Sequence, residues 1–213
     1  YNDSKKYLDI FFLPDSIKIT NGSLFTERDF DNITEIAAGG KRDIIDNIGT
    51  FGVGFVSVFQ ITDIPAIYSN GVMVKLDPRK SKVNFTRNSV TDHTEFLFPL
   101  RFTQTETGRT IEAGVVCKDK IEEMKDLLIE KLPLMILFLR NLNRIRVYDG
   151  NTLSLDLRKT VEIYDSECCK VTINNKSSEK TWVIVHRVFD KGVFTDNKKS
   201  AHISIAFDFS SKV

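Results

Sequence analysis

The feature that most constrains this chain is a set of glycines placed directly before an apolar segment. Gly49, Gly52 and Gly54 lead into the segment 55–59, which is apolar apart from one serine. Glycine lets the backbone approach a bound group closely, and the free amides at the start of a helix attract phosphate. The pattern favours either a phosphate-binding loop or a tight turn that packs a helix against a sheet, and the glycines alone do not decide between them.

Two common phosphate-binding motifs do not fit these glycines. A dinucleotide fingerprint needs repeated strand–helix–strand units and an acidic residue about 20 residues further on, and neither accompanies Gly49. A P-loop needs Lys and then Ser or Thr after its last glycine, whereas Phe55 and Val56 follow Gly54. The sequence therefore excludes both of these motifs.

Strand patterns alternate along the chain and become denser after residue 143. Before that point the sequence predicts strands at 7–13, 17–20 and 94–100, and a hairpin whose tight turn is Asn70-Gly71. Beyond it the sequence predicts a hairpin over 144–157 and strands at 161–164, 169–173, 182–188 and 202–209, with turns at 174–175 and 196–197. The chain thus reads as mixed α and β structure followed by a β-rich stretch.

Helix signals are clearest at two places. Thr26 and Asp29 have the spacing of a capping box, which predicts a helix over 27–37. Asp119 opens a second capping-box candidate before an apolar stripe, which predicts a longer helix there. Pro133 has no amide to donate, so we expect the second helix to kink or restart at that residue.

Charge and cysteine content narrow the class of partners. The chain has 30 Lys and Arg against 29 Asp and Glu, a formal net charge of +1, which argues against a nucleic-acid partner. No apolar run approaches the ~20 residues of a membrane span, so no membrane partner is predicted. Cys117, Cys168 and Cys169 form no CxxC pair and the histidines are isolated, so we predict no disulfide framework, no metal site and a cytoplasmic location.

The wider sequence around the glycines resembles a known superfamily. The run 46–59, centred on Phe51-Gly52-Val53-Gly54-Phe55, resembles the second glycine box of the GHKL ATPases. That superfamily includes gyrase, the ninety-kilodalton heat-shock chaperone, histidine kinases and MutL. The continuation over 60–71 resembles the chaperone-like, sacsin-type domains. The resemblance is specific over 20–78 and weaker over 94–148.

This resemblance implies a fold and a division of the chain. The expected fold is α+β: a two-layer α/β sandwich, the Bergerat fold, with a mixed sheet covered by helices on one face. Residues 1–143 would form the ATP-binding domain without its first helix. Residues 144–213 would form a following β-rich region, which we expect to be truncated.

The resemblance also implies a nucleotide site. The superfamily holds adenine with an Asp where this chain has Asn21-Gly22, and the Asn21 amide oxygen can accept from an amine without the charge; the other interpretation is a simple Asn-Gly turn. Thr94 matches a Thr that supports adenine, although His93 replaces the usual preceding glycine. The phosphate-binding residues would be Gly49, Phe51, Gly52, Val53, Gly54 and Phe55.

The remaining parts of the site fall on a lid and on a helix outside this chain. The segment 32–47 matches the lid over ATP, with a hinge at Gly39-Gly40, and Lys41 or Arg42 would reach a phosphate. The superfamily's general-base Glu and its magnesium-binding Asn lie on a first helix, which we expect upstream of Tyr1. The chain is therefore expected to be a fragment with no catalytic or metal-binding residue of its own, and not to hydrolyse ATP alone.

Three functions are compatible with these residues. We predict an ATP-binding module of a chaperone-like protein, with ATP and magnesium as cofactors, that couples binding and slow hydrolysis to conformational change. The alternative is a degenerate relative that serves as an interaction or dimerisation module, because the acidic residue at Asn21 and the glycine at His93 are missing. A nucleic-acid-processing relative is the third, and the balanced charge argues against it. The expected partners are ATP or ADP, a protein partner or client, and a second copy of the chain.

Overall fold

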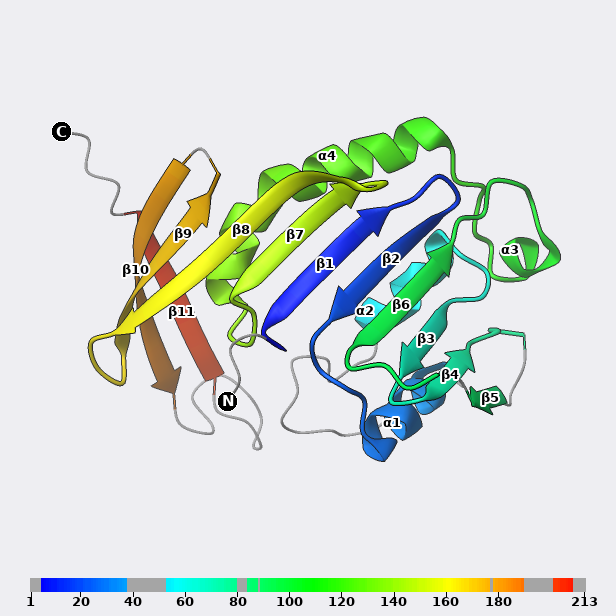
Figure 1. Cartoon of the computed structure of the whole chain (residues 1–213), viewed down its shortest axis with the longest axis horizontal. Coiled ribbons are helices and arrows are strands. Elements are labelled where there is room, and N and C mark those ends of the chain that lie inside the picture. Colours follow the sequence, from blue (N-terminus) through cyan, green and yellow to red (C-terminus); the bar gives the residue numbers. More distant parts are fainter. Residues whose placement is uncertain are drawn as a thin grey trace.

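The strands of this protein form one large mixed sheet. The computed structural model describes residues 5–37, 53–79, 84–87, 89–176, 178–189 and 201–208. Within them, 11 strands lie in the order β11-β10-β9-β8-β7-β1-β2-β6-β3-β4-β5 (Figure 1). The strands before residue 143 are β1 (Tyr7–Phe12), β2 (Ser16–Asn21), β3 (Ala66–Ser69), β4 (Val72–Lys75), β5 (Asn84–Arg87) and β6 (Thr94–Pro99). The later strands are β7 (Arg144–Asp149), β8 (Thr152–Ile163), β9 (Cys168–Asn175), β10 (Ser178–Phe189) and β11 (Ala201–Asp208).

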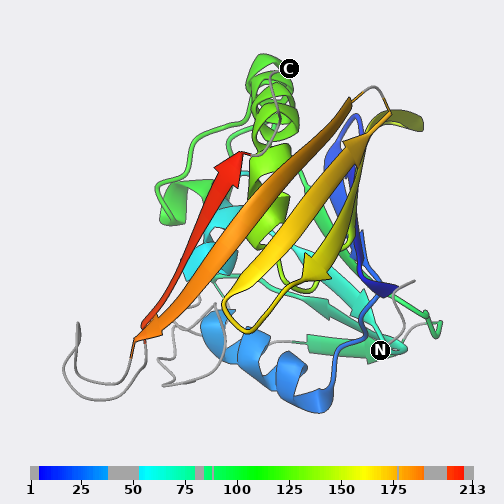
Figure 2. The ribbon, with the colours of Figure 1, turned by 90° about the vertical axis from the view of Figure 1, so that its left-hand side faces the viewer.

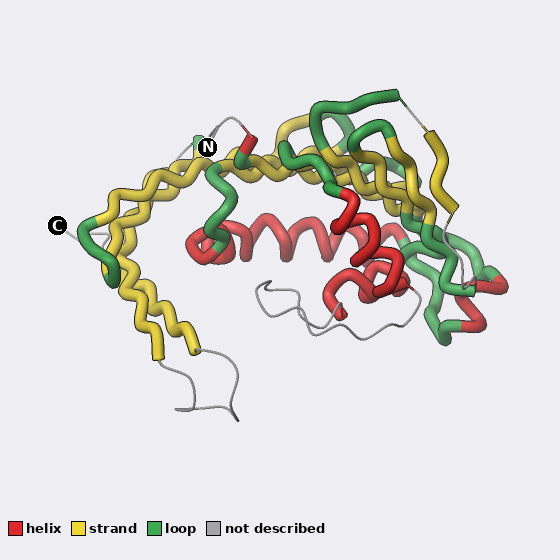
Figure 3. Tube along the Cα trace, turned by 90° about the horizontal axis from the view of Figure 1, so that it is seen from below, coloured by secondary structure: helices red, strands yellow, loops and turns green. Residues whose placement is uncertain are grey.

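Helices cover one face of this sheet. They are α1 (Glu27–Ala37), α2 (Val53–Val56) with the 3-10 turn η2 (Ser57–Gln60), α3 (Glu106–Thr110), and α4 (Lys118–Met135) with the 3-10 turn η3 (Ile136–Phe138). Figure 3 shows α1, α2 and α4 on the same, concave side of the curved sheet. The predicted α+β fold with two layers and a mixed sheet is therefore confirmed. No helix in the described part of the chain is long and apolar enough to cross a membrane.

The centre of the sheet joins the beginning of the chain to its later part. β1 pairs antiparallel with β2 and parallel with β7, with Tyr7 opposite Arg144. The main core cluster likewise contains Ile10 of β1, Ile145 of β7 and Trp182 of β10. The sheet and this core are continuous across the predicted boundary at residue 143, so the division into two units stays a prediction. β8 to β11 extend the sheet and twist away from its first strands (Figure 2).

Local signals predicted two features correctly. The Thr26 amide donates to Asp29 Oδ2 at 2.8 Å and the Asp29 amide donates to Thr26 Oγ1 at 3.3 Å, so the capping box starts α1 at Glu27 as expected. Asn70 and Gly71 have φ angles of 49° and 74° between β3 and β4. Positive φ at both positions is the mark of the tight primed turn that Asn-Gly favours.

The capping prediction for the long helix was wrong, the predicted restart at Pro133 is not seen, and the alternative kink at Pro133 stays a prediction. α4 begins at Lys118 with Cys117 as its N-cap residue, which makes no side-chain cap bond. Asp119 is therefore not a cap but lies in the first turn, where its charge suits the positive end of the helix dipole. The helix also continues through Pro133 to Met135 before tightening into η3. The lost backbone bond is offset by the burial of apolar side chains on both sides of the proline, Leu132 and Ile136.

One predicted strand is not separate. The segment 161–164 was expected to be a separate strand, but β8 runs unbroken from Thr152 to Ile163. The Lys159 side chain is buried, and its ammonium donates to the carbonyls of Ile136 at 3.2 Å and of Leu139. Lys159 is therefore a buried residue whose ammonium binds carbonyls at the end of the α4–η3 helix. The turn predicted at Asn174-Asn175 begins after Asn175, because both residues still pair as the last two of β9. The turn predicted at 196–197 lies outside the described residues.

Candidate functional site

Asn21 and Thr94, which were predicted to contact adenine, lie side by side. Asn21 is the last residue of β2 and Thr94 the first of β6, and the two are direct partners in the antiparallel pair. Asn21 lies two residues from Ile19 on β2, and Thr94 lies two residues from Phe96 on β6, so each pair shares a face of its strand. Ile19 and Phe96 both pack against the main core. Both predicted residues therefore belong to the helix-covered face of the sheet.

The Thr94 hydroxyl belongs to a chain of hydrogen bonds among residues of this protein. Thr94 is fully buried, and its Oγ1 donates to the Ser23 carbonyl at 2.6 Å. Because that proton is committed, Thr94 Oγ1 accepts from Ser69 Oγ at 2.6 Å, and Ser69 Oγ in turn accepts the Phe25 amide at 2.8 Å. The network fastens the loop between β2 and α1 to the ends of β3 and β6.

The Asn21-Gly22 dipeptide makes contacts typical of a turn. Asn21 Oδ1 accepts the Ser23 amide at 3.0 Å, an Asx-turn that uses one of the two lone pairs of the amide oxygen. A Cβ atom added to Gly22 would lie 2.4 Å from the carbonyl oxygen of Lys5. Any side chain at position 22 would collide with the backbone of Lys5, so the fold itself requires glycine there. The role of Asn21 toward adenine stays a prediction.

The glycine segment is described in part. Gly39, Gly40, Lys41, Arg42, Gly49, Phe51 and Gly52 lie outside the described residues. Val53 is the first residue of α2. Gly54 is exposed, and among the described residues, apart from its own helix backbone, no atom lies within 4 Å of where a Cβ on it would stand, so the described part of the chain leaves the space beside it open. Phe55 packs instead against the smaller core cluster around Phe59. Gly54 is thus the described residue of the segment that leaves room for a bound group.

A buried arginine behind this segment was missed by the sequence analysis. The Arg101 side chain has no exposed surface, and its Nε donates to Asp63 Oδ1 at 2.6 Å. Its Nη2 donates to the carbonyl of Thr62 at 3.0 Å and to that of Phe59, which lie at the end of η2. A cation at this place satisfies carbonyls that a helix end leaves free. The available signal was Asp63, an acidic residue in the sacsin-like stretch, whose side chain is only partly exposed and pairs with the buried arginine.

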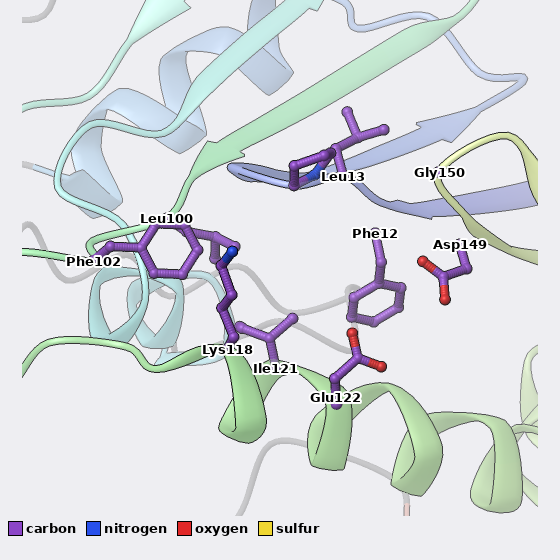
Figure 4. A pocket seen from close by; sticks show the side chains of 10 residues that line it. Phe12, Leu13, Leu100, Phe102, Lys118, Ile121, Glu122, Asp149 and Gly150 are labelled. Atoms are coloured by element: carbon purple, nitrogen blue, oxygen red, sulfur yellow. The ribbon is translucent and has the colours of Figure 1, made fainter.

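A cavity of about 310 Å³ lies beside the ends of β1, β6 and β7, and Figure 4 shows the side chains that line it. Thr94 is at the other end of β6 from this cavity. The apolar lining of the cavity is Phe12, Leu13, Pro14, Leu100, Phe102 and Ile121, and its remaining lining is Lys118, Glu122, Asp149 and Gly150. Its volume falls at the lower end of the range for small-molecule sites. Of the predicted nucleotide-site residues that the structure describes, none lines it.

An ion-pair triad borders this cavity. Lys125 Nζ lies 2.6 Å from Asp149 Oδ2 and 2.5 Å from Glu122 Oε2. Hydrogen bonds to Asp149 and then to Glu122 raise the pKa of Lys125, because both favour its charged form. The ammonium is buried while both carboxylates are more than half exposed. The triad ties the second turn of α4 to the end of β7.

Metal-binding groups do not gather in the described part of the chain. Among those residues, no three His, Cys, Asp or Glu side chains are placed to hold one ion. Cys169 Sγ lies 3.7 Å from His186 Nε2, and His186 Nδ1 lies 2.7 Å from Ser204 Oγ. Burial raises the pKa of the Cys169 thiol, so this thiol is held in its neutral form.

Fold and site together define an α+β protein whose mixed sheet has helices on one face and a glycine segment at the start of a short helix. The family model of the Sacsin domain matches residues 10–92, which include Asn21 and the whole glycine segment. Human sacsin is 44% identical over 64 residues, which is 30% of this chain and 1% of sacsin. The predicted sacsin-type resemblance is therefore confirmed over residues 10–92, and the chain spans about 1% of the length of this relative.

A solved structure matches over more of the chain but less closely. The ATPase domain of Aquifex aeolicus MutL, in a mutated form, is 8% identical and covers 87% of this chain and 69% of its own. The TM-score is 0.41. We base no argument about the site on a likeness of this size.

Proposed function

We propose that this chain is the ATP-binding module of a chaperone-like, sacsin-type protein of the GHKL class. The observation that carries the proposal is the glycine segment, because it lies within the stretch that matches the Sacsin domain and leads into α2 with open space beside Gly54. The backbone amides of this segment would receive the phosphates, and the edge formed by Asn21 and Thr94 would receive the base.

The chain's own residues have defined tasks in this proposal. When bound, ATP supplies a triphosphate whose negative charge suits free amides at a helix start. Gly54 lets the backbone come close to that charge, since it has no side chain in the way. The network of Ser23, Ser69 and Thr94 holds the edge of the base site rigid before the nucleotide arrives.

Hydrolysis and conformational coupling belong to the same proposal for a longer protein. By resemblance, the general base and the magnesium ligand lie on a segment outside residues 1–213. A protein client and a second copy as partner likewise rest on the resemblance, whereas the proposed cytoplasmic location rests on the cysteine pattern. The points that rest on the resemblance therefore depend on whether this chain binds ATP at all.

A second candidate function is an interaction module that keeps the fold without binding ATP. One observation favours it: the polar groups expected to meet adenine already contact the protein itself. Thr94 donates to Ser23, Asn21 accepts from Ser23, and Gly22 accommodates the backbone of Lys5. The two proposals differ in one measurable property, the affinity for ATP.

Calorimetric titration with ATP and magnesium tests the proposal. We expect saturable binding to the chain, and a Gly54→Ala variant should bind about tenfold or more weakly, because its methyl group would displace a charge-assisted bond. Ser154→Ala is the control. Ser154 is exposed on β8, away from the glycine segment and from every residue of the proposed site, so its affinity for ATP should not change. No binding by the folded wild-type chain, or equal affinity of both variants, would contradict the proposed site and favour the interaction module.

A further inference from the structure

Arg101 joins three segments that are separate in the sequence. Besides its bonds to the 59–63 segment, its Nη1 donates to the Gly114 carbonyl at 3.1 Å. Its backbone continues the same connections, because the Arg101 amide donates to the Ile61 carbonyl at 2.9 Å and its carbonyl accepts the Val116 amide at 2.8 Å. Arg101 itself follows β6, so the side chain and backbone together hold the end of η2 and the 114–116 segment against the sheet.

The short helix α3 is fitted to the Arg101 side chain. A Cβ atom added to Gly108 would lie 2.9 Å from Arg101 Cδ and 3.2 Å from its Nε. Thr105 caps α3 by accepting the Gly108 amide at 2.9 Å, which fixes Gly108 in the first turn of the helix. The absence of a side chain at Gly108 is thus what allows α3 to pack directly on the arginine.

Arg101 connects the end of η2 to the residues that precede α4. α2 continues directly into η2, so the carbonyls held by Arg101 are at the far end of the helical segment that carries Gly54. On the other side, Val116 precedes Cys117, the N-cap residue of α4. A movement of the α2–η2 helical segment along its axis must therefore either move the 114–117 chain or break the bonds of Arg101.

The chemistry of the side chain suits a connection of this kind. A guanidinium is planar and presents several donors in a fixed fork, so it can bind groups from different segments at set angles. A lysine would place one flexible ammonium there and could not reproduce all of these bonds. Asp63 supplies the single carboxylate that balances the buried charge at 2.6 Å. The other described bonds of the side chain go to uncharged carbonyls. These carbonyls belong to the end of η2 and to Gly114.

From this geometry we propose that Arg101 is a positioning residue that couples the glycine segment to residues 105–117. The proposal rests on the proposed function, because the bound group that shifts the glycine segment is taken to be a nucleotide. Nucleotide binding near Gly54 then tightens α3 and the start of α4, although neither touches the nucleotide. The link runs from Gly54 through α2 and η2 to Arg101, and from Arg101 to Gly114 and Val116.

Hydrogen exchange followed by mass spectrometry tests this coupling on the whole chain. With magnesium and a non-hydrolysable ATP analogue, amide exchange in the wild type should slow both at 53–62 and at 105–117. In Arg101→Lys the response at 53–62 should persist while the response at 105–117 is lost. The affinity for the analogue should fall by about fivefold or more, as expected when a coupling is removed.

A second variant covers the case in which Arg101→Lys does not fold. Gly108→Ala pushes on the same side chain from α3, and it should also remove the response at 105–117. Arg109→Ala is the matched control, since Arg109 is the exposed neighbour on the same helix and should keep both responses. Thermal melting of each variant shows that the comparison is made on folded protein.

The outcomes separate this inference from the proposed function. Slowed exchange at 53–62 with no change at 105–117 in the wild type would overturn the coupling and leave ATP binding intact. A response at 105–117 that survives both Arg101→Lys and Gly108→Ala would overturn the role of Arg101. No response at either segment and no heat of binding would contradict the proposed function and remove the coupling with it.

Discussion

Two regions of this protein end a helix with a buried basic side chain, and they do so with different chemistry. At the end of η2, Arg101 binds two carbonyls and is balanced by Asp63 at 2.6 Å. At the end of η3, Lys159 binds the carbonyls of Ile136 and Leu139. Burial is the main influence on Lys159 and lowers its pKa, because an amine can give up its proton when a buried charge is costly. An arginine keeps its charge over the usable pH range and has no such escape.

The difference between a permanent and a removable charge determines how strongly each helix end depends on its partners. A permanent buried charge makes its partner indispensable, because loss of either member leaves an uncompensated charge. A lysine bound by carbonyls does not depend on a charged partner, since its neutral form still has two N–H groups to donate. We therefore expect the Arg101 region to depend sharply on its ion pair and the Lys159 region to tolerate change. The following experiments probe that expectation.

The largest effect is expected from Arg101→Met. This variant leaves Asp63 and the helix-end carbonyls without their partner, so the free energy of unfolding should fall by about 3–5 kcal/mol. Urea denaturation measures this change. The control Arg109→Met removes an exposed arginine from α3 and should change stability by no more than about 0.5 kcal/mol. A loss below about 1 kcal/mol in Arg101→Met would show that the ion pair is dispensable.

Asp63→Asn should have the next largest effect. The amide oxygen can still accept from Arg101 Nε, but the charge that balanced the guanidinium is gone. We expect a loss of about 2 kcal/mol in the free energy of unfolding, the size of a hydrogen bond to a charged group. Asp126→Asn, at an exposed position of α4, is the control and should be neutral. A neutral Asp63→Asn variant would mean that geometry alone, and not charge balance, matters at Arg101.

Lys159→Met should cost less than either. The carbonyls of Ile136 and Leu139 lose their donor, but a desolvated amine leaves the core at the same time, so we expect a loss of about 1 kcal/mol. The same urea titration at neutral pH measures it. If Lys159→Met were as damaging as Arg101→Met, the two helix ends would be equivalent and the contrast between them would be wrong.

The smallest effect is the pH dependence of the two buried lysines, and its signs are opposite. The lowered pKa of Lys159 means that the folded state disfavours its charged form, so its contribution to stability grows as the pH rises toward its ordinary value near ~10.4. The raised pKa of Lys125 means that its contribution is present below that value and is lost as the pH rises through the raised one. We expect the stability differences from Lys159→Met and Lys125→Met to change in opposite directions with alkaline pH. Parallel changes would contradict this.

Much of the fold could be predicted because its signals are local. The Thr26–Asp29 box and the Asn70-Gly71 turn each depend on residues a few positions apart, and both are confirmed. The errors came from long-range contacts. β8 continues through Lys159, whose ammonium binds the carbonyls of Ile136 and Leu139, and no local signal shows that these carbonyls lie beside it. The path of α4 through Pro133 also depends on core burial that a local signal does not show.

The candidate site was predicted in the same uneven way. The pairing of Asn21 with Thr94 follows from two strand ends whose roles the family resemblance suggested. Arg101 was missed because its partners come from 59–63 and 114–116, and no spacing in the sequence connects these segments. The cavity beside Glu122 was missed for the same reason, since its lining comes from four separate parts of the chain.

The parallel pairing of β1 with β7 has a consequence for how this protein is made. Tyr7 faces Arg144, so one side of a central strand has no partner until residues 144–149 have left the ribosome. β1 and β2 can pair early through their short turn, whereas closing such a long loop is slow because its entropy is lost before the contact forms. A nascent chain therefore exposes an apolar strand edge until residues 144–149 emerge, which is the condition under which chains aggregate or engage chaperones.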